Sequence, residues 1–335
     1  MVEARGLRGG GERRPLLQVA ARARTRLSRR QLLSTTCTSD YSRHPESAIR
    51  YLYESTGTGS ALPNVTSQNP SKGGPHSMPD LPRQQPLEAR VAVVTGGSRG
   101  IGAALAAALR GAGAQVVISG RSKEPLQKTA AALDALPVVA DALERSTAGK
   151  PVREAIEHFG GIDILVNNVG GGVAGNPDIF AGDLEGFEAN LTLNLTSAYW
   201  STSAAVHSMR ERGHGRVINI GSGASKYAAA TPAYTAAKHG LAGLTKQLAM
   251  DLAPHSITVN CVCPGWTNTD LSSFEQLGRR QGISAEEARR RAEAESAQRR
   301  ILEPEELGAM IVLLASAGGA PITGQVIGVD GGYRL

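Results

Sequence analysis

From Arg90 onward, short runs of β-branched and aliphatic residues alternate with Ala- and Leu-rich stretches of helical length. The seven runs are Val91–Thr95, Gln115–Ser119, Pro137–Ala140, Asp163–Asn167, Arg216–Ile220, Ile257–Val262 and Val326–Val329. Strands that are apolar on both faces and separated by helices are typical of a parallel sheet covered on both sides. The sequence therefore predicts one α/β domain over residues 86–335, a doubly wound sheet of seven parallel strands whose ligand crevice lies at the carboxyl ends of the strands.

Residues 1–85 differ from the rest of the chain in composition. Residues 1–77 hold 12 Lys and Arg against 5 Asp and Glu, whereas the remainder of the chain holds 24 against 25. The segment is rich in Arg, Ser, Gly and Pro without sustained apolar periodicity, so we expect a disordered, basic extension. Two interpretations stay open: a dispensable tail or start-site artefact, which the ordinary lead-in at Met78 favours, or an Arg-rich organellar transit peptide.

Charge, hydropathy and cysteine content exclude several classes of protein. The net positive charge resides in the extension, so the domain is not expected to bind nucleic acid. No stretch approaches the roughly 18 to 20 consecutive apolar residues that cross a bilayer. Cys261 and Cys263 lie too close in one strand-like run to bridge without strain, and no histidine has ligand partners at metal-site spacing. We expect a cytoplasmic protein with reduced thiols, no bound metal and no nucleic-acid or membrane partner.

The first predicted strand runs directly into a glycine-rich turn, Thr95-Gly96-Gly97-Ser98-Arg99-Gly100-Ile101-Gly102, and then into a helix. A pyrophosphate requires backbone N–H groups at a helix N-terminus and an approach that no β-carbon blocks. Glycines 96, 100 and 102 meet both requirements in a GxxxGxG spacing. Strand, turn and helix in this order predict a Rossmann-type dinucleotide site that uses Gly96, Ser98, Arg99, Gly100, Ile101 and Gly102.

The end of the second predicted strand bears on the choice of dinucleotide. An NAD-selective site places an acidic side chain there to bind the ribose 2′-hydroxyl, whereas this strand ends Ser119-Gly120-Arg121. Arg99 and Arg121 offer two guanidinium groups to a 2′-phosphate, which a carboxylate would repel. The sequence favours NADP(H) over NAD(H), and the alternative is that both arginines are solvated surface residues.

Tyr234 and Lys238 stand four residues apart at the start of a helical stretch that reaches Leu252. This spacing places both side chains on one helix face. A phenol with a pKa of about 10 is a poor acid or base at neutral pH, and a nearby ammonium stabilises its phenolate form. The segment Tyr234-Thr235-Ala236-Ala237-Lys238 resembles the YxxxK signature of the short-chain dehydrogenase/reductase family, in which the lysine also binds the nicotinamide ribose. The resemblance extends over residues 90–333.

Resemblance to this family implies two further catalytic residues. Ser222 corresponds to the serine that polarises the substrate carbonyl. It stands twelve positions before Tyr234, one fewer than is commonest in the family, so Ser225 is the alternative. Asn194 matches the asparagine that kinks the central helix and holds a proton-relay water, with Asn190 as its local competitor.

Other segments resemble the family's cofactor contacts. Asn168, in Asn167-Asn168-Val169-Gly170, resembles the asparagine of the motif that closes the fourth strand against the cofactor. Asp141, after the third strand, resembles the acid that contacts the adenine. A last set, Pro264, Gly265 and Thr269, resembles the segment beside the nicotinamide amide.

The segment from about residue 270 to 303 is the only long excursion at the nicotinamide end, so we expect a substrate lid there. Ser284-Ala285-Glu286-Glu287 predicts a capping box, followed by a charged helix over Ala288–Arg300. The arginines of the lid are compatible with an acidic carrier or coenzyme A, but the neighbouring glutamates favour an ordinary solvated face.

Two further similarities narrow the chemistry. The stretch Tyr234–Gly265 resembles 3-oxoacyl-thioester and polyketide ketoreductases, and the insertion Gly282–Glu287 resembles that of 3-hydroxybutyrate dehydrogenases. We therefore expect an NADPH-dependent oxidoreductase that reduces a small ketone, free or thioester-linked, to a secondary alcohol, or the reverse. The alternatives are an NAD-dependent 3-hydroxy acid or alcohol dehydrogenase and a non-catalytic dinucleotide sensor. Small residues on the helices around 184–209 and 231–252 would allow close helix packing between subunits. Because the family that the chain resembles is commonly tetrameric, we expect a homotetramer.

Overall fold

The computed structural model describes residues 85–172, 178–269 and 273–335. All of them belong to the second of two units into which the chain divides, Met78–Leu335. The predictions for residues 1–84, a disordered basic extension or a transit peptide, lie outside the described residues, as do residues 270–272 of the expected lid.

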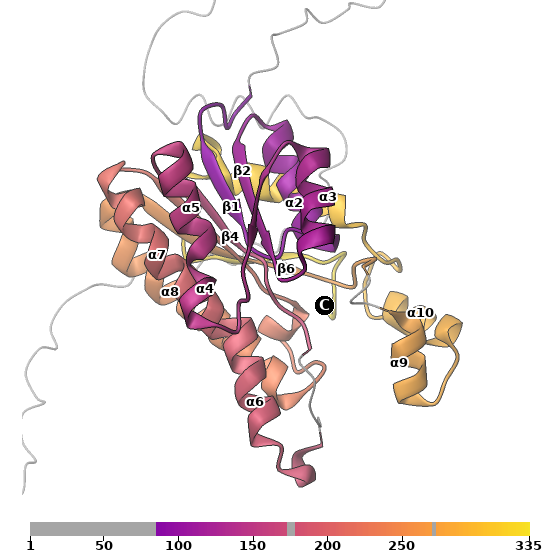
Figure 1. The fold of residues 1–335 in the computed structure, drawn as a ribbon. Coiled ribbons are helices and arrows are strands. Elements are labelled where there is room, and N and C mark those ends of the chain that lie inside the picture. Colours follow the sequence, from indigo (N-terminus) through magenta and orange to yellow (C-terminus); the bar gives the residue numbers. More distant parts are fainter. Residues whose placement is uncertain (1–84, 173–177, 270–272) are drawn as a thin grey trace, which may run out of the picture. The chain divides into compact units, whose positions relative to one another are not determined.

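Seven parallel strands form one sheet, as the sequence predicts (Figure 1). They are β1 (Val91–Val94), β2 (Gln115–Gly120), β3 (Leu136–Val139), β4 (Ile164–Asn167), β5 (Gly215–Ile220), β6 (Ile257–Pro264) and β7 (Val326–Val329). Their order in the sheet is β3-β2-β1-β4-β5-β6-β7. From β1 the chain continues to β2 on one side, and from β4 it continues to β5 on the other side, so the strand order reverses between β1 and β4. In open α/β sheets, ligands bind at such a switch point, outside the carboxyl ends of the strands.

Helices cover both faces of the sheet. One face carries α2 (Gly100–Gly111), α3 (Lys123–Leu133) and α11 (Gly308–Ala315), and the other carries α5 (Lys150–Phe159), α7 (Ser197–Glu211) and α8 (Pro232–Leu252). Alternate strand residues point to opposite faces. Val94 shares one buried cluster with Leu105 of α2, whereas its neighbour Val93 shares the other with Met209 of α7. Burial on both faces explains why the strands lack polar alternation.

The shorter elements connect these layers. They are α4 (Arg145–Ala148), η1 (Ile179–Ala181), α6 (Leu184–Leu191), η2 (Thr192–Thr196), η3 (Gly223–Ser225), η4 (Ala253–His255), η6 (Pro304–Leu307) and η7 (Ala317–Gly319). The π-helical turn η2 joins α6 to α7 without a break, so one long helical stretch runs from beside the sheet to beyond its carboxyl edge (Figure 1).

The expected lid contains two helices, α9 (Phe274–Gln281) and α10 (Ala285–Ala294), which form a pair set off from the layers (Figure 1). The Ser284 hydroxyl accepts a hydrogen bond from the backbone N–H of Glu287 at 3.1 Å, as expected for the helix start. The prediction that the helix continues to Arg300 is wrong. After Ala294 the backbone turns to pair with residues 331–334, and the N–H of Gln298 donates to the Gly331 carbonyl at 3.0 Å.

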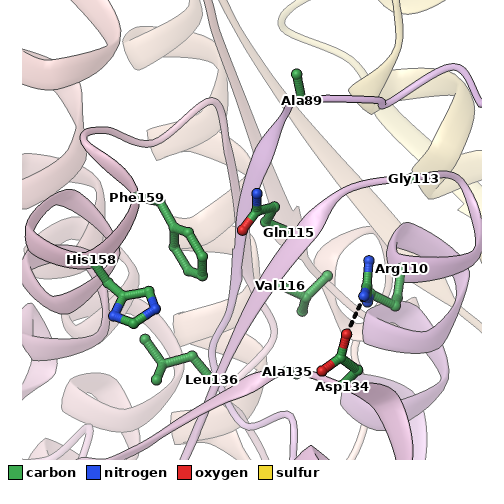
Figure 2. A pocket seen from close by; sticks show the side chains of 10 residues that line it. All are labelled: Ala89, Arg110, Gly113, Gln115, Val116, Asp134, Ala135, Leu136, His158 and Phe159. Atoms are coloured by element: carbon green, nitrogen blue, oxygen red, sulfur yellow. Dashed lines mark hydrogen bonds and ion pairs between the residues drawn. The ribbon is translucent and has the colours of Figure 1, made fainter.

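A cavity of about 490 Å³ opens at the amino edge of the sheet (Figure 2). Side chains from the ends of α2 and α5 and from the starts of β2 and β3 line it, among them Arg110, Gln115 and Phe159. None of the predicted site residues lines this cavity, so we place the candidate active site at the opposite, carboxyl edge. Within the described ranges, no helix combines the length and the apolar character that crossing a bilayer requires.

Candidate active site

The glycine-rich turn after β1 has the geometry that close backbone approach requires. Gly96 and Gly100 have positive φ angles of 68° and 52°, which side chains with a β-carbon rarely adopt. A β-carbon on Gly102 would lie 2.2 Å from the Gly96 carbonyl oxygen, so only glycine allows the turn to close on the first turn of α2. The amide groups at this helix N-terminus form an anion site, and the turn fits the pyrophosphate of a dinucleotide.

The glycine-rich turn after β1 is hydrogen-bonded to the end of β2. The Gly97 N–H donates to the Ser119 carbonyl at 2.8 Å, and a β-carbon on Gly120 would lie 3.2 Å from Ser98 Oγ. Arg99 and the exposed Arg121 therefore leave adjoining backbone segments. The end of β2 carries Gly120 and Arg121 and no acidic residue, so a negatively charged ribose substituent meets no carboxylate from this strand.

Asn168 joins the end of β4 to the glycine-rich turn. Its amide nitrogen donates to the carbonyls of Thr95 at 3.0 Å and Gly96 at 3.1 Å, and its own backbone N–H donates to Thr95 Oγ1 at 3.0 Å. The role found for Asn168 is thus to shape the turn. Ile101 packs partly buried against the core on the α2 face.

The four remaining predicted cofactor contacts follow β3 and β6. Asp141 follows β3 in a tight turn, where its carboxylate accepts the N–H of Leu143 at 3.0 Å. Thr269, after β6, lies beside the glycine-rich turn, since a β-carbon on Gly100 would be 3.4 Å from its methyl group. Pro264 ends β6, and a β-carbon on the following Gly265 would lie 2.7 Å from the Asp330 carbonyl oxygen.

Lys238 is a buried cation next to Tyr234. Only 2% of Lys238 is exposed, its Nζ donates to the Ile220 carbonyl at 2.9 Å, and it lies 5.7 Å from the centre of the Tyr234 ring. Tyr234 is half-buried in the first turn of α8, whose N-cap Thr231 accepts the Tyr234 N–H at 3.2 Å. The structure thus places a buried ammonium beside the ring of Tyr234, on the same helix.

The π-helical turn η2 decides between the two candidate asparagines. Asn194 is 1% exposed and exchanges two hydrogen bonds of 2.9 Å with the backbone of Gly171. A β-carbon on Gly170 would lie 3.0 Å from both Asn194 Oδ1 and Lys238 Nζ, so both side chains pack against Gly170. Asn190 instead donates back to the Gly186 carbonyl within α6 at 2.8 Å. The structure brings Asn194, and not Asn190, to the lysine.

The two candidate serines have different surroundings. Ser222 follows β5 in extended conformation and is half-buried, and its hydroxyl accepts the N–H of Ala224 at 3.2 Å. Ser225 is buried, and its hydroxyl accepts the Ser222 N–H at 3.2 Å. Ser225 therefore supports the loop from inside, which leaves Ser222 as the better candidate for substrate contact.

Comparison with known proteins agrees with this geometry. The family described as Enoyl-(Acyl carrier protein) reductase matches residues 96–334. The chain belongs to the short-chain dehydrogenase/reductase family. It is therefore an NAD(P)-dependent oxidoreductase that interconverts small carbonyl and alcohol compounds, as the sequence predicts.

Relatives in this family cover the domain almost completely. A D-beta-hydroxybutyrate dehydrogenase of Cupriavidus necator is 35% identical over 257 residues, 74% of this chain and 98% of the relative. A Streptomyces coelicolor protein described as a ketoacyl reductase is 34% identical over 73% of this chain and 97% of its own. The crystal structure of a short-chain type dehydrogenase/reductase from Mycobacterium marinum, 31% identical, has a TM-score of 0.68 over 75% of this chain and 98% of its own.

Sequence reasoning missed one group of residues in this short-chain dehydrogenase. Trp266, Glu295, Tyr333 and Arg334 contact one another beside the loop that follows Ser222. They come from three distant segments, so no spacing in the sequence signals them. Among the described residues, no group of three His, Cys, Asp or Glu side chains is placed to hold a metal ion.

Proposed function

We propose that this protein is an NADPH-dependent reductase that converts a ketone of the 3-oxoacyl type into a secondary alcohol, with Tyr234 as the proton donor. The observation that carries the proposal is the convergence of Tyr234, Lys238 and Asn194 beside the loop of Ser222 at the carboxyl edge of the sheet. A sensor that only binds dinucleotide would need Lys238 for the ribose but would not need the phenol of Tyr234 beside it.

The proposed reaction adds a hydride to the carbonyl carbon and a proton to the carbonyl oxygen. The nicotinamide supplies the hydride when it is bound. Ser222 donates a hydrogen bond to the carbonyl oxygen, and Tyr234 delivers the proton. Lys238 stabilises the phenolate that remains, and its location against Gly170 also suits contact with a ribose. Asn194 holds the backbone of Gly171. Its proposed role is to keep this part of the site in place for a proton relay that restores the proton of Tyr234.

The preference for NADP(H) rests on the corner between the glycine-rich turn and β2. Arg99 and Arg121 leave adjoining segments there, and Gly120 occupies the place where an acid would repel a 2′-phosphate. Each well-placed guanidinium contributes about 1.5 to 3 kcal/mol through charge-assisted hydrogen bonds. We expect a preference for NADPH over NADH of more than about tenfold.

A 3-oxoacyl substrate, free or thioester-linked, is supported by the relatives. The Streptomyces coelicolor protein is described as a ketoacyl reductase and the Cupriavidus necator protein as a D-beta-hydroxybutyrate dehydrogenase, and both names imply a β-hydroxy or β-keto group. The second name also supports an alternative, oxidation of a 3-hydroxy acid with NAD. Reduction of a 3-oxoacyl compound with NADPH and oxidation of a 3-hydroxy acid with NAD differ in cofactor and in direction. One assay with both cofactors therefore distinguishes the two functions.

We also propose that the enzyme is a cytoplasmic homotetramer. Large apolar side chains are exposed on the outer helices, including Leu184 of α6 at 73% and Met250 of α8 at 76%. Burial of such side chains between subunits is favourable. Cys261 and Cys263 are buried free thiols. Light scattering at micromolar concentration should give four times the mass of one chain; the mass of one chain would refute the assembly.

The function is tested by following NADPH oxidation against a panel of ketones. The panel holds 3-oxoacyl thioesters, free 3-oxo acids, cyclic ketones and sugars, each with NADPH and with NADH. We expect the highest kcat/KM for a 3-oxoacyl compound with NADPH. Binding of NADPH without turnover of any member would favour the sensor, and faster oxidation of a 3-hydroxy acid with NAD would favour the alternative dehydrogenase.

A further inference from the structure

Glu295, the residue after α10, joins two distant segments. Its carboxylate accepts hydrogen bonds from Trp266 Nε1 at 2.8 Å and from an Arg334 Nη atom at 2.9 Å. Its backbone carbonyl accepts the Arg334 N–H at 2.9 Å. Burial alone would raise the pKa of Glu295, and the hydrogen bonds from Trp266 and Arg334 outweigh it, so that the pKa lies below its usual value and the carboxylate stays charged.

Tyr333 connects Glu295 to the loop that begins at Ser222. The Tyr333 side chain is 7% exposed, and a β-carbon on Gly223 would lie 2.4 Å from a ring carbon, so the ring packs directly on the Gly223 backbone. Burial, with the nearby Glu295 carboxylate, raises the pKa of Tyr333 to about 12. The hydroxyl is therefore protonated at neutral pH and interacts with that carboxylate. Tyr227, on the same loop, packs edge-to-face against the Tyr333 ring, with 6.1 Å between the two ring centres.

Arg334 holds the loop at a second point. A guanidinium nitrogen donates to the Ala228 carbonyl at 2.8 Å, and the guanidinium lies 5.0 Å from the centre of the Tyr333 ring. Two contacts therefore hold the loop between Ser222 and Tyr234: the Tyr333 ring packs on Gly223, and Arg334 donates a hydrogen bond to the Ala228 carbonyl. Because η3 is a single short turn, its position depends on such tertiary contacts more than on its own hydrogen bonds.

Trp266 connects Glu295 to the segment after β6. It follows Gly265 at the end of β6, beside the segment expected to contact the nicotinamide, and its ring lies 6.2 Å from that of Phe274 on α9. Trp266, Glu295, Tyr333 and Arg334, which we call the Glu295 cluster, therefore connect three parts of the site: the lid, the segment after β6 and the loop of Ser222.

We propose that Glu295 is a positioning residue that holds the Ser222 loop in register with the segment after β6, so that Ser222 and Tyr234 face the reacting carbonyl together. This inference rests on the proposed function. Glu295 itself touches neither Ser222 nor Tyr234; it acts through Tyr333, Arg334 and Trp266. A misplacement of about 1 Å in a reacting geometry costs on the order of a hundredfold in rate, so the cluster controls kcat more than cofactor binding.

The test compares Glu295→Ala with Glu293→Ala in the full chain. Glu293 lies on α10, and its carboxylate pairs with Arg289 at 2.9 Å. Its loss removes a lid ion pair but no contact made by the four cluster residues themselves, because Arg289 reaches Trp266 only through Phe274. Three quantities are measured: kcat per NADPH-binding site, the Kd of NADPH, and hydrogen exchange of the amides of residues 223–230. Because kcat is calculated per NADPH-binding site, unfolded protein that binds no NADPH does not lower the measured kcat.

We expect Glu295→Ala to lower kcat at least about tenfold and to speed amide exchange in residues 223–230, with the Kd of NADPH changed less than about threefold. Glu293→Ala should leave all three unchanged. If Glu295→Ala folds poorly, Glu295→Gln and Tyr333→Phe provide milder changes in the same cluster, and Glu295→Gln should restore part of kcat.

Equal kcat and equal loop exchange in the two alanine variants would overturn the proposal. If the wild-type protein reduces no ketone but Glu295→Ala still speeds loop exchange, the proposed function fails while the positioning role of Glu295 stands. If neither activity nor a change in loop exchange is found, both fail.

Discussion

Two buried charges near opposite edges of the parallel sheet have different kinds of neighbours. At the carboxyl edge, Lys238 is a buried cation whose neighbours are neutral: the Ile220 carbonyl, the Asn194 amide and the Tyr234 ring. At the amino edge, Asp163 is completely buried and bonded to both Arg90 at 3.0 Å and Arg212 at 3.2 Å. Charges that neutralise each other stabilise a fold, whereas a charge held among neutral groups remains available to a ligand or a reacting atom.

Titration at the amino edge reflects these pairings. Burial would raise the pKa of Asp163, but hydrogen bonds from the Val91 N–H and from both arginines lower it below its usual value. Burial and the nearby Arg216 lower the pKa of His214 to about 4. The amino edge, which also contains the cavity of Figure 2, is therefore expected to set stability, and the carboxyl edge to set activity.

The largest expected effect is on activity, from the carboxyl edge. Tyr234→Phe should lower kcat by about two to four orders of magnitude, because it removes the proton donor and leaves the ring in place. NADPH binding and thermal stability should change little. Tyr199→Phe, on the exposed face of α7, is the matched control and should keep full activity. A near-normal kcat in Tyr234→Phe would remove Tyr234 from the mechanism.

The second effect is on stability, from the amino edge. Asp163→Asn should lower the free energy of unfolding by about 3 kcal/mol, because it leaves two arginines and a backbone N–H without their carboxylate. Thermal unfolding should then show a Tm lower by roughly 6 to 12 °C, with kcat of the folded enzyme unchanged. Asp134→Asn breaks the exposed pair with Arg110 and should leave Tm within about 1 °C. Similar Tm values for the two variants would contradict the distinction between buried and exposed pairs.

A third effect tests whether the carboxyl edge selects its cofactor by charge. Gly120→Asp should raise the KM for NADPH more than about tenfold over that for NADH, because a carboxylate would repel the 2′-phosphate. Gly120→Ala introduces the same β-carbon, 3.2 Å from Ser98 Oγ, without the charge and should keep the preference. Steady-state kinetics at low and high salt decide the matter, since the difference should shrink as salt increases. If the wild-type protein used NADPH and NADH with equal kcat/KM, Arg121 would be an ordinary surface residue with no part in cofactor selection.

The smallest effect is the pH dependence contributed by His214. Its pKa in the folded protein, about 4, lies below the value of about 6.5 in an unfolded chain, so between these pH values only the unfolded chain binds the proton. Stability should therefore fall as the pH is lowered from 7 to 5, by about 1 kcal/mol once the partial exposure of the ring is taken into account. Urea unfolding of His214→Gln should lose this part of the slope. An unchanged slope would show that other groups titrate there.

Much of the fold could be predicted from the sequence because its signals are local. All seven strands lie within a residue or two of the β-branched runs, and Tyr234 and Lys238 lie on one helix, as their spacing requires. The glycine-rich turn was recognisable because close backbone approach leaves no other choice of residue at Gly102.

What could not be predicted depends on contacts between distant segments. Asn194 is distinguished from Asn190 by a π-helical turn, and Ser222 from Ser225 by which hydroxyl lies inside the loop. The early end of α10 follows from pairing with Tyr333 and its neighbours, far along the chain. Asp163 was visible only as the first residue of a strand, because nothing nearby in sequence indicates that Arg212 would reach it.

The functional difference between the edges requires that the carboxyl edge carries out carbonyl reduction with NADPH. The most direct measurement is the mass of the alcohol formed from a 3-oxoacyl thioester when the wild-type protein is supplied with NADPH deuterated at the transferable position of its nicotinamide. We expect that the product carries one deuterium at the new carbinol carbon, and that Tyr234→Phe forms it at least about a hundredfold more slowly. Tight binding of the deuterated NADPH with no labelled alcohol from any ketone of the panel would contradict it.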